Sequence, residues 1–122
     1  MNSGAAADDC VFCKIVRGEI PSKKVFEDGD ILAFNDIQPI APVHVLVIPK
    51  LHLATLYECN TSHEVLLGKM MVLVPRLARE LGCNDGFRTI INTGHVGRQE
   101  VYHLHLHIIG GPAPLPGMLT RG

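Results

Sequence analysis

The chain has 122 residues, of which 47% are hydrophobic and 19% are charged. This composition supports one packed core, whereas two independent cores in so short a chain would both be marginal. The formal net charge is −1 and the longest basic run is Lys23-Lys24, so the charge pattern of a nucleic-acid-binding protein is absent. We therefore expect a single domain over residues 1–122 with no nucleic-acid partner.

Targeting and membrane signals are also missing. No apolar stretch approaches the roughly 18 residues of a membrane-spanning helix. Residues 1–9 are small and polar and lack the charged-then-apolar pattern of a signal peptide, so we expect a flexible N-terminus. These features predict a cytoplasmic protein with no membrane partner. In that reducing compartment, a Cys-x-x-Cys pair indicates a metal site or free thiols more often than a disulfide.

The first half of the sequence predicts one short helix and three strands. Asp8 and Asp9 are candidate caps for the helix, and Gly18 follows its end. Asp28-Gly29-Asp30 separates the first two strands and predicts a hairpin, because Asp-Gly accepts the positive φ of a tight turn. The predicted elements are a helix at 10–17 and strands at 24–27, 31–35 and 42–49.

The second half predicts one longer helix and two strands. Thr61 is a candidate N-cap with Glu64 as its reciprocal partner, opening a helix that runs to about Leu81. Pro75 lies inside that pattern and predicts a kink or a break. The remaining predictions are strands at 87–92 and 101–109 and an extended C-terminal tail at 112–122.

Three alternating histidines are the strongest chemical signal in the sequence. If residues 101–109 form a strand, then His103, His105 and His107 project from one face while Leu104 and Leu106 project from the other. Such a row of imidazoles suits a divalent metal. It equally suits a phosphate, with one neutral ring as nucleophile and its neighbours as hydrogen-bond donors. The spacing alone does not choose between these two chemistries.

The segment from Tyr102 to Ile109 resembles the signature of the histidine triad (HIT) family. The similarity spans residues 10–111 and is greatest to the branch of histidine triad nucleotide-binding proteins. Further matches lie upstream in the family's order: Phe12-x-Lys14-Ile15, Gly18-Glu19-Ile20-Pro21, Phe26-Glu27-Asp28, Leu32-Ala33-Phe34-x-Asp36-Ile37, Ala41-Pro42-x-His44-x-Leu46-Val47-Ile48-Pro49-Lys50 and Asn92.

This resemblance implies an α+β fold with a five-stranded antiparallel sheet per subunit, a short N-terminal helix and one longer, kinked helix. It also implies a homodimer whose sheet is continuous across the interface. The implied activity is hydrolysis of nucleoside phosphoramidates and related nucleoside monophosphate esters, with purine nucleotides such as AMP or GMP as partners. No cofactor is required for this chemistry.

The resemblance also implies roles for individual residues. His105 would be the nucleophile, with His103 orienting it. His44 and His107 would line the α-phosphate, and Asp36 would bind the ribose hydroxyls. The base would lie among Ile37, Phe12, Ile15 and Phe34, and the phosphate and leaving group would be bordered by Asn92, Arg98, Gln99 and Glu100.

Three features depart from the family pattern. Glu100 stands where well-studied relatives have a serine that assists the leaving amine, and Arg98 replaces a glycine. A carboxylate can protonate an amine if its pKa is raised, but an ionised one repels phosphate. The tail at 112–122 also differs from the tryptophan-containing ending of those relatives, and that tail helps to select substrates. The preferred leaving group is therefore left open.

The sequence leaves two further alternatives open. Cys10-x-x-Cys13 supplies two candidate zinc ligands, and zinc-bearing members of the family complete the site at positions matching His52 and His103. Two buried thiols without a metal fit the same sequence. The rival to an enzyme is a noncatalytic protein, either a nucleotide sensor or a zinc-stabilised interaction module. The intact set of four histidines, which a pure binder would not need, favours the enzyme.

Overall fold

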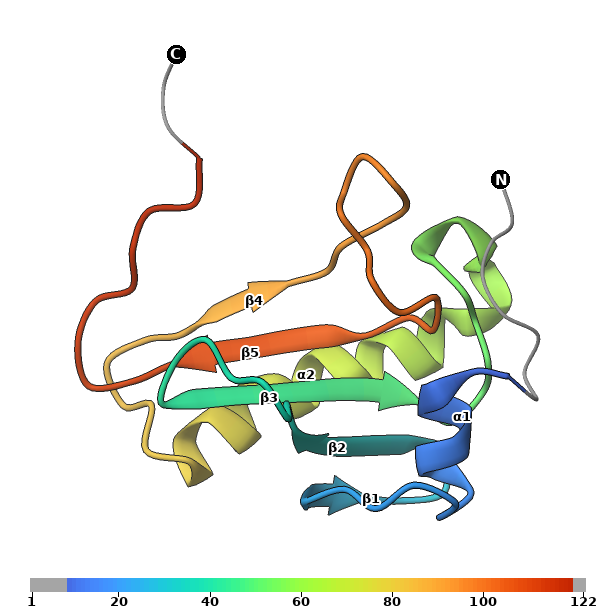
Figure 1. The fold of residues 1–122 in the computed structure, drawn as a ribbon, viewed down its shortest axis with the longest axis horizontal. Coiled ribbons are helices and arrows are strands. Elements are labelled where there is room, and N and C mark those ends of the chain that lie inside the picture. Colours follow the sequence, from blue (N-terminus) through green and yellow to red (C-terminus); the bar gives the residue numbers. More distant parts are fainter. Residues whose placement is uncertain (1–8, 120–122) are drawn as a thin grey trace.

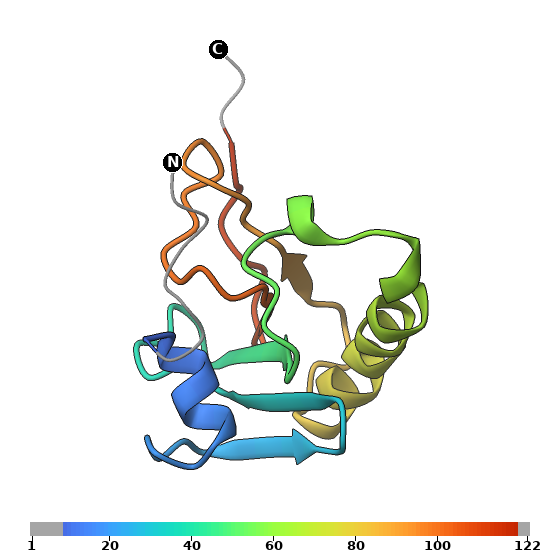
Figure 2. The same cartoon turned by 90° about the vertical axis from the view of Figure 1, so that its right-hand side faces the viewer.

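The computed structural model describes residues 9–119, which form an α+β fold around one antiparallel sheet (Figure 1). The five strands follow the order β1-β2-β3-β5-β4, and α1 and α2 cover opposite faces of the sheet (Figure 2). This confirms the predicted fold class. The elements are α1 (Val11–Val16), β1 (Lys24–Glu27), β2 (Ile31–Asn35), β3 (Val43–Pro49), the 3₁₀ helices η1 (Leu56–Glu58) and η2 (Thr61–His63), α2 (Glu64–Glu80), β4 (Arg88–Ile90) and β5 (Leu106–Gly110).

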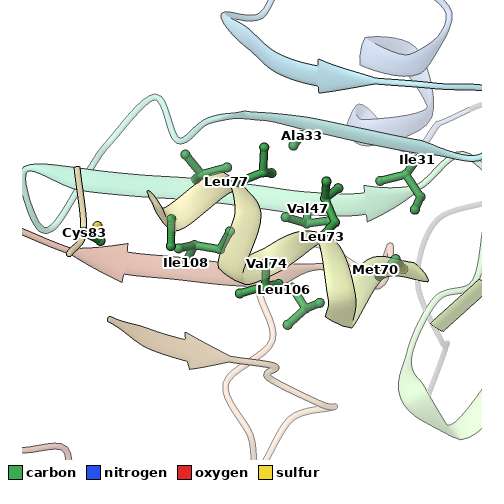
Figure 3. Close-up of a cluster of buried hydrophobic side chains, with 12 residues drawn as sticks. Ile31, Ala33, Val47, Met70, Leu73, Val74, Leu77, Cys83, Leu106 and Ile108 are labelled. Carbon is green, nitrogen blue, oxygen red and sulfur yellow. The ribbon is translucent and has the colours of Figure 1, made fainter. Parts of the chain in front are cut away.

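Alternating side chains divide the core into two clusters, one on each face of the sheet. Ala33, Val47 and Ile108 belong to the cluster beneath α2. Figure 3 shows Leu73 and Leu77 of that helix pointing toward these strands. The other cluster joins α1 to the opposite face and consists of Cys10, Phe12, Cys13, Ile15, Leu32, Phe34, Leu46 and Ile48. Fully burying one such Leu or Ile side chain stabilises the fold by about 1.5–3 kcal/mol.

The N-terminal helix begins one residue later than predicted and has a different cap. Cys10 is the N-cap, and its Sγ accepts a hydrogen bond from the Cys13 N–H over 3.3 Å. Asp9 does not cap the helix, and Asp8 lies outside the described residues, as do the other residues of the predicted flexible N-terminus up to position 8. A cysteine therefore both begins α1 and faces the core.

The hairpin between β1 and β2 forms as predicted, but by a different turn chemistry. Gly29 is absent from the residues with positive φ. Instead Asp28 Oδ1 accepts two backbone N–H groups, from Asp30 and Ile31, each over 2.8 Å. The aspartate side chain closes the turn, so glycine's freedom at positive φ is not needed there.

The predicted start of α2 is wrong. Asn60, not Thr61, is the cap: its side chain accepts the Ser62 N–H while His63 reciprocates, which forms η2. The α-helix follows at Glu64 without a side-chain cap because the chain is already helical there. A second capping box, between Thr55 and Glu58 in η1, was not predicted.

The helix α2 continues through Pro75 without a break. The ring removes the N–H that would bond to the carbonyl of Met71. Met71 is exposed, so water can reach the turn that loses this bond. The buried residues on both sides of the proline, Val74 and Leu77, keep the helix packed on the sheet.

The last two strands are shorter than predicted, and this corrects the expected strand of histidines. β5 begins only at Leu106, so His107 is in the sheet whereas His103 and His105 precede it. The Leu104 N–H bonds to the Leu53 carbonyl over 2.6 Å rather than to a neighbouring strand. The histidine row is therefore part loop and part strand.

The C-terminal segment leaves the sheet as an extended tail, as predicted for its described part, up to residue 119. Residues 120–122 of the predicted tail lie outside the described residues. Arg88 of β4 donates from Nη1 to the Pro116 carbonyl over 2.8 Å.

Gly110 ends β5 close to a buried thiol. A Cβ at this position would lie 2.7 Å from Cys83 Sγ, so a larger residue would force one of the two to move. Within residues 9–119, no helix has both the length and the apolar character needed to cross a membrane.

Candidate active site

Two imidazole rings meet on the sheet face that α1 covers. His44 lies in β3 and His107 in β5, and Leu46 of β3 pairs directly with His107. Since side chains two residues apart share a face, His44, Leu46 and His107 all project toward α1. His44 Nε2 lies 2.9 Å from His107 Nδ1. The sheet thus brings together two of the histidines that sequence analysis placed at a phosphate.

Backbone contacts determine which ring nitrogens carry protons. The Ile40 N–H donates to His44 Nδ1 over 3.2 Å, which leaves the His44 proton on Nε2. That N–H can donate to His107 Nδ1, and Asp36 Oδ2 lies 3.4 Å away as a second acceptor. The proton of neutral His107 is then on Nε2. The chain of hydrogen bonds from Ile40 through His44 to His107 therefore ends at His107 Nε2–H, which donates to no group within residues 9–119.

His105 has the opposite arrangement. Its Nδ1 lies 2.8 Å from the carbonyl oxygen of His103, which can only accept, so Nδ1 carries the proton. Nε2 therefore keeps its lone pair. The ring sits between His107, with centroids 5.0 Å apart, and the edge of Phe12, at 5.3 Å. The site places a basic imidazole nitrogen next to an imidazole N–H donor.

Burial keeps all three rings neutral near pH 7. It lowers the pKa of His44 and His105 from their ordinary value, and lowers that of His107 to about 4. The Asp36 carboxylate partly offsets the effect of burial on the pKa of each ring. For His105 the Glu100 carboxylate acts in the same direction as Asp36. Neutral imidazole is the form that can act as a nucleophile.

Asp36 follows β2 directly and is held beside His44. Its backbone N–H donates to the His44 carbonyl over 2.9 Å, and its Oδ1 accepts the Gln38 N–H over 2.8 Å. The side chain is 20% exposed. The carboxylate is therefore positioned by the backbone while one edge remains open to a ligand.

The four apolar residues assigned to the base occupy different environments. Phe12, Ile15 and Phe34 are buried in the core cluster beneath α1. The ring centroids of Phe12 and Phe34 lie 5.5 Å apart in an edge-to-face arrangement, and Phe12 in turn contacts the His105 ring. Ile37 is 95% exposed and is the one of the four with a free apolar surface.

The loop between β4 and β5 is cross-linked by its own amide side chains. Gln99 is buried; its Oε1 accepts the Gly94 N–H over 2.9 Å, and its Nε2 donates to the Ala54 carbonyl over 2.8 Å. Asn92 Nδ2 donates to the Gly97 carbonyl over 2.8 Å. Both residues assigned to the nucleotide thus bond to the backbone, and both ends of the Gln99 amide are engaged.

The neighbouring residues of this loop are exposed. Arg98 and Glu100 both face solvent. Arg98 has a φ of 61°, the left-handed region that favours glycine. Gly97 beside it tolerates no side chain, since a Cβ would lie 2.4 Å from the Thr93 carbonyl oxygen. The loop therefore exposes one cation and one carboxylate, and the Glu100 carboxylate is close enough to His105 to act on the pKa of that ring.

Cys10, Cys13, His52 and His103 converge behind His105. His103 Nδ1 lies 3.3 Å from Cys10 Sγ, 3.5 Å from Cys13 Sγ and 3.2 Å from His52 Nδ1. Cys13 Sγ lies 3.2 Å from His52 Nδ1. Four ligands around a tetrahedral Zn²⁺ lie about 3.3–3.8 Å from one another, from the usual Zn–N and Zn–S lengths. The spacing of these donors therefore fits a zinc ion.

The protonation pattern of this cluster also fits a metal. His103 Nε2 donates to the Pro49 carbonyl over 2.8 Å, so its Nδ1 is free to coordinate, and burial lowers its pKa to about 4. Burial and the adjacent Cys10 raise the pKa of Cys13 to about 11. A bound cation reverses that effect, because it stabilises the thiolate. Asp36, His44 and His107 form a second group of donors within metal-binding reach.

Three backbone groups of the site were not predicted from the sequence. They are the Ile40 N–H on His44, the Pro49 carbonyl on His103 and the His103 carbonyl on His105. Every residue has such groups, so the residue types in the sequence do not indicate where they will act.

Comparison with known proteins agrees with this geometry. The family model described as HIT domain matches residues 17–113. "Protein HitA" of Neisseria gonorrhoeae is 53% identical over 105 residues, 86% of this chain and 98% of that protein. "Purine nucleoside phosphoramidase" of Escherichia coli K12 is 44% identical over 116 residues, 94% and 97% of the two chains. The crystal structure of a HIT family hydrolase from Legionella pneumophila Philadelphia 1 superposes with a TM-score of 0.83 at 47% identity, covering 86% and 95%.

The fold and the histidine site thus define an α+β protein of the histidine triad class. The extent of the family match and these identities show that the chain belongs to the HIT family.

Proposed function

We propose that this protein hydrolyses nucleoside 5'-phosphoramidates and related nucleoside monophosphate esters, with purine nucleosides such as adenosine or guanosine as the preferred class. The observation that carries the proposal is the neutral His105 ring, whose Nδ1 is held by the His103 carbonyl at 2.8 Å and whose Nε2 is free. The E. coli relative named for purine nucleoside phosphoramidase activity supports the substrate class.

The reaction takes place in two displacements. In the first, His105 Nε2 attacks the α-phosphorus, a P–N bond forms to the ring, and the P–N bond to the leaving amine breaks. In the second, water attacks the same phosphorus and the bond to His105 breaks, which releases the nucleoside monophosphate. The His103 carbonyl accepts from Nδ1–H throughout and stabilises the positive charge of the intermediate.

The neighbouring histidines stabilise the phosphoryl oxygens. His107 Nε2–H is an unused donor, and His44 fixes its orientation through the 2.9 Å contact. Fixed donors of this kind stabilise the charge that builds up on the equatorial oxygens in the transition state. His44 and His107 therefore contribute binding and electrostatic stabilisation, while His105 forms the covalent bond.

The remaining open groups fit a nucleoside and its leaving group. Asp36 presents a carboxylate to the ribose hydroxyls, and exposed Ile37 offers apolar surface to the base. In the first step the leaving amine would take its proton from solvent, and in the second the Glu100 carboxylate would accept a proton from the attacking water and release it to solvent, so Glu100 returns to its starting state. Arg98 balances the charge of Glu100 near the phosphate. Asn92 and Gln99 would act by fixing the loop.

One assay separates the enzyme from a noncatalytic nucleotide binder. The protein is incubated with adenosine 5'-phosphoramidate, with and without a chelator, and release of AMP is followed. The proposal expects AMP in both reactions. Binding of AMP without turnover of the phosphoramidate would support the rival. Activity that vanishes on chelation and returns with zinc, at unchanged thermal stability, would place a metal on Asp36, His44 and His107 and contradict the nucleophilic mechanism.

We further propose that the Cys10, Cys13, His52 and His103 cluster holds one structural zinc ion per chain. Four protein ligands leave no open position to activate water, so hydrolysis does not require the metal. Zinc content of the purified protein and the thermal midpoint before and after chelation test this proposal. Loss of about one zinc per chain should lower the midpoint, because metal binding energy adds to folding energy.

We also propose that the chain forms a homodimer through the β4 edge of its sheet. The β1 edge has a bulge between Lys24 and Phe26 and ends in charged residues, which discourages pairing. The β4 edge has an unpaired side, and α2 exposes Val65, Met71 and Val72. Pairing of two β4 edges would make one continuous sheet and cover apolar surface on both copies.

A further inference from the structure

The candidate metal cluster and the candidate nucleophile share their supporting residues. His103 contributes its Nδ1 to the cluster and its carbonyl oxygen to His105 Nδ1, at 2.8 Å. Phe12 lies between Cys10 and Cys13 in sequence and presents its ring to both His103, at 5.9 Å, and His105, at 5.3 Å. The two contacts to the His105 ring, from the His103 carbonyl and from the Phe12 ring, therefore both come from segments that carry cluster donors.

The segments that carry cluster donors also hold these two contacts. α1 has six residues, and a helix that short is not stable by itself. It is held to the sheet by its apolar side chains and by the two cysteines that face His52 and His103. The peptide unit that carries the His103 carbonyl is held by the Leu104 N–H bond to the Leu53 carbonyl over 2.6 Å, and Leu53 directly follows His52. The His103 ring donates from Nε2 to the Pro49 carbonyl and directs Nδ1 at the cluster donors.

We propose that the metal held by Cys10, Cys13, His52 and His103 is the positioning element for His105. When the four donors are drawn together, the His103 peptide and the Phe12 ring are fixed, and these keep His105 Nε2 directed at the phosphorus. No step of the reaction passes through the metal. This inference rests on the proposed function, and it makes His103 and Phe12 positioning residues.

The positioning role predicts a specific kinetic signature. His44, His107 and Asp36 lie on β3, on β5 and after β2, and none of them belongs to the cluster. Nucleotide binding should therefore survive removal of the metal, while attack by His105 slows. Loss of groups that orient a reacting side chain typically costs about 10–100-fold. We expect kcat to fall by about that factor while the Kd for AMP changes less than about 3-fold.

The test uses the full-length protein and three variants. Cys13→Ser removes one donor. Cys83→Ser is the matched control, because Cys83 is also a buried thiol but lies beneath α2, outside the cluster. Cys13→His restores a donor at the same position and serves as the rescue. For each protein, zinc content, far-UV circular dichroism, the Kd for AMP, kcat for adenosine 5'-phosphoramidate and the ¹⁵N NMR signals of the His105 ring are measured.

The expected result is that Cys13→Ser loses zinc and kcat but keeps its AMP affinity, and that its His105 ring signals broaden or report a mixture of tautomers. Cys83→Ser should match the parent, and Cys13→His should regain zinc and kcat relative to Cys13→Ser. A folded, metal-free Cys13→Ser with parental kcat and parental His105 signals would overturn the proposal, as would a parent that binds no metal.

The NMR readout separates this proposal from the proposed function. If the parent shows no turnover, the hydrolase assignment fails, yet a change of the His105 tautomer on zinc removal would still support positioning. If turnover is normal and the ring signals do not respond to zinc, positioning fails and the hydrolase assignment stands. If AMP affinity and circular dichroism fall in step with kcat, the metal only supports the fold, and positioning is contradicted.

Discussion

At the scale of single residues, the chemistry of the site depends on where backbone groups meet imidazole rings. The His103 carbonyl accepts from His105 Nδ1–H, which leaves Nε2 of that ring unprotonated, whereas the Ile40 N–H donates to His44 Nδ1, which leaves the His44 proton on Nε2. Identical side chains thereby present an unprotonated nitrogen in one case and an N–H donor in the other. The sequence identifies the histidines but not their protonation, because the groups that determine it are common to every residue.

The first prediction concerns the pH dependence of stability. Burial holds the pKa of His107 at about 4 in the folded protein, against about 6.5 in an unfolded chain. Between these values the unfolded state binds a proton that the folded state does not, so stability falls as pH drops from about 7 to 5. After allowing for its partial exposure, we expect His107 to account for about 1–2 kcal/mol of that loss.

The measurement is urea unfolding of the parent and of His107→Gln at both pH values. The variant cannot titrate at this position, so its loss of stability on acidification should be smaller by that amount. Equal losses in the two proteins would contradict a depressed pKa at His107.

At the scale of elements, the sequence predicts where regular structure lies better than how it begins and ends. Four strands and α1 lie within two residues of their predicted bounds, α2 begins three residues after its predicted cap, and the strand predicted at 101–109 begins only at Leu106. There the alternation of histidine and leucine predicts a strand from its first residue, but His103 turns toward the cysteines and the Pro49 carbonyl instead. Long-range contacts of this kind override a local period of two.

The capping residues show the same limit. Thr61 and Glu64 match the capping-box pattern, as do Thr55 and Glu58. Only the second pair forms the box, because Asn60 starts a 3₁₀ turn that places Thr61 inside a helix. The pattern is local, so it cannot choose between neighbouring candidates.

The second prediction concerns Pro75 in α2. Since the helix runs through this residue, Pro75→Ala should restore the missing bond to the Met71 carbonyl and remove the clash of the ring. We expect stability to rise by about 1–3 kcal/mol, because a proline inside a helix costs about that much. Urea or thermal unfolding measures the change. A less stable variant would show that the proline ring makes a contact that alanine cannot replace.

At the scale of the whole molecule, the HIT fold places His105, the His44–His107 pair of β3 and β5, and the Cys10, Cys13, His52 and His103 cluster around one short helix. The order of motifs along the chain predicts this assembly through family resemblance. It does not predict that the Asn92 and Gln99 side chains bond to the backbone within and beside their loop, because the residue type does not indicate whether an amide is bonded within the protein or open to a ligand.

The third prediction concerns assembly. The parent should have a mass near twice the chain mass of 13.3 kDa at micromolar concentration by light scattering. Val72→Glu places a charge on the exposed apolar side of α2 and should shift the mass toward one chain, because an unpaired charge in an interface is costly. The control Glu80→Lys changes an exposed charged residue of the same helix that lies about 80° around the axis from Val72. A parent that scatters as a single chain would contradict the dimer.

The central claim is that His105 is the nucleophile of a nucleoside phosphoramidate hydrolase, and comparison of the parent with His105→Ala tests it most directly. Both proteins are given adenosine 5'-phosphoramidate, AMP release is followed, and AMP affinity is measured in parallel. We predict that kcat falls by roughly 10³-fold or more while AMP affinity changes little, because the variant loses only the attacking atom. Turnover by the variant at a rate comparable with the parent would contradict the account.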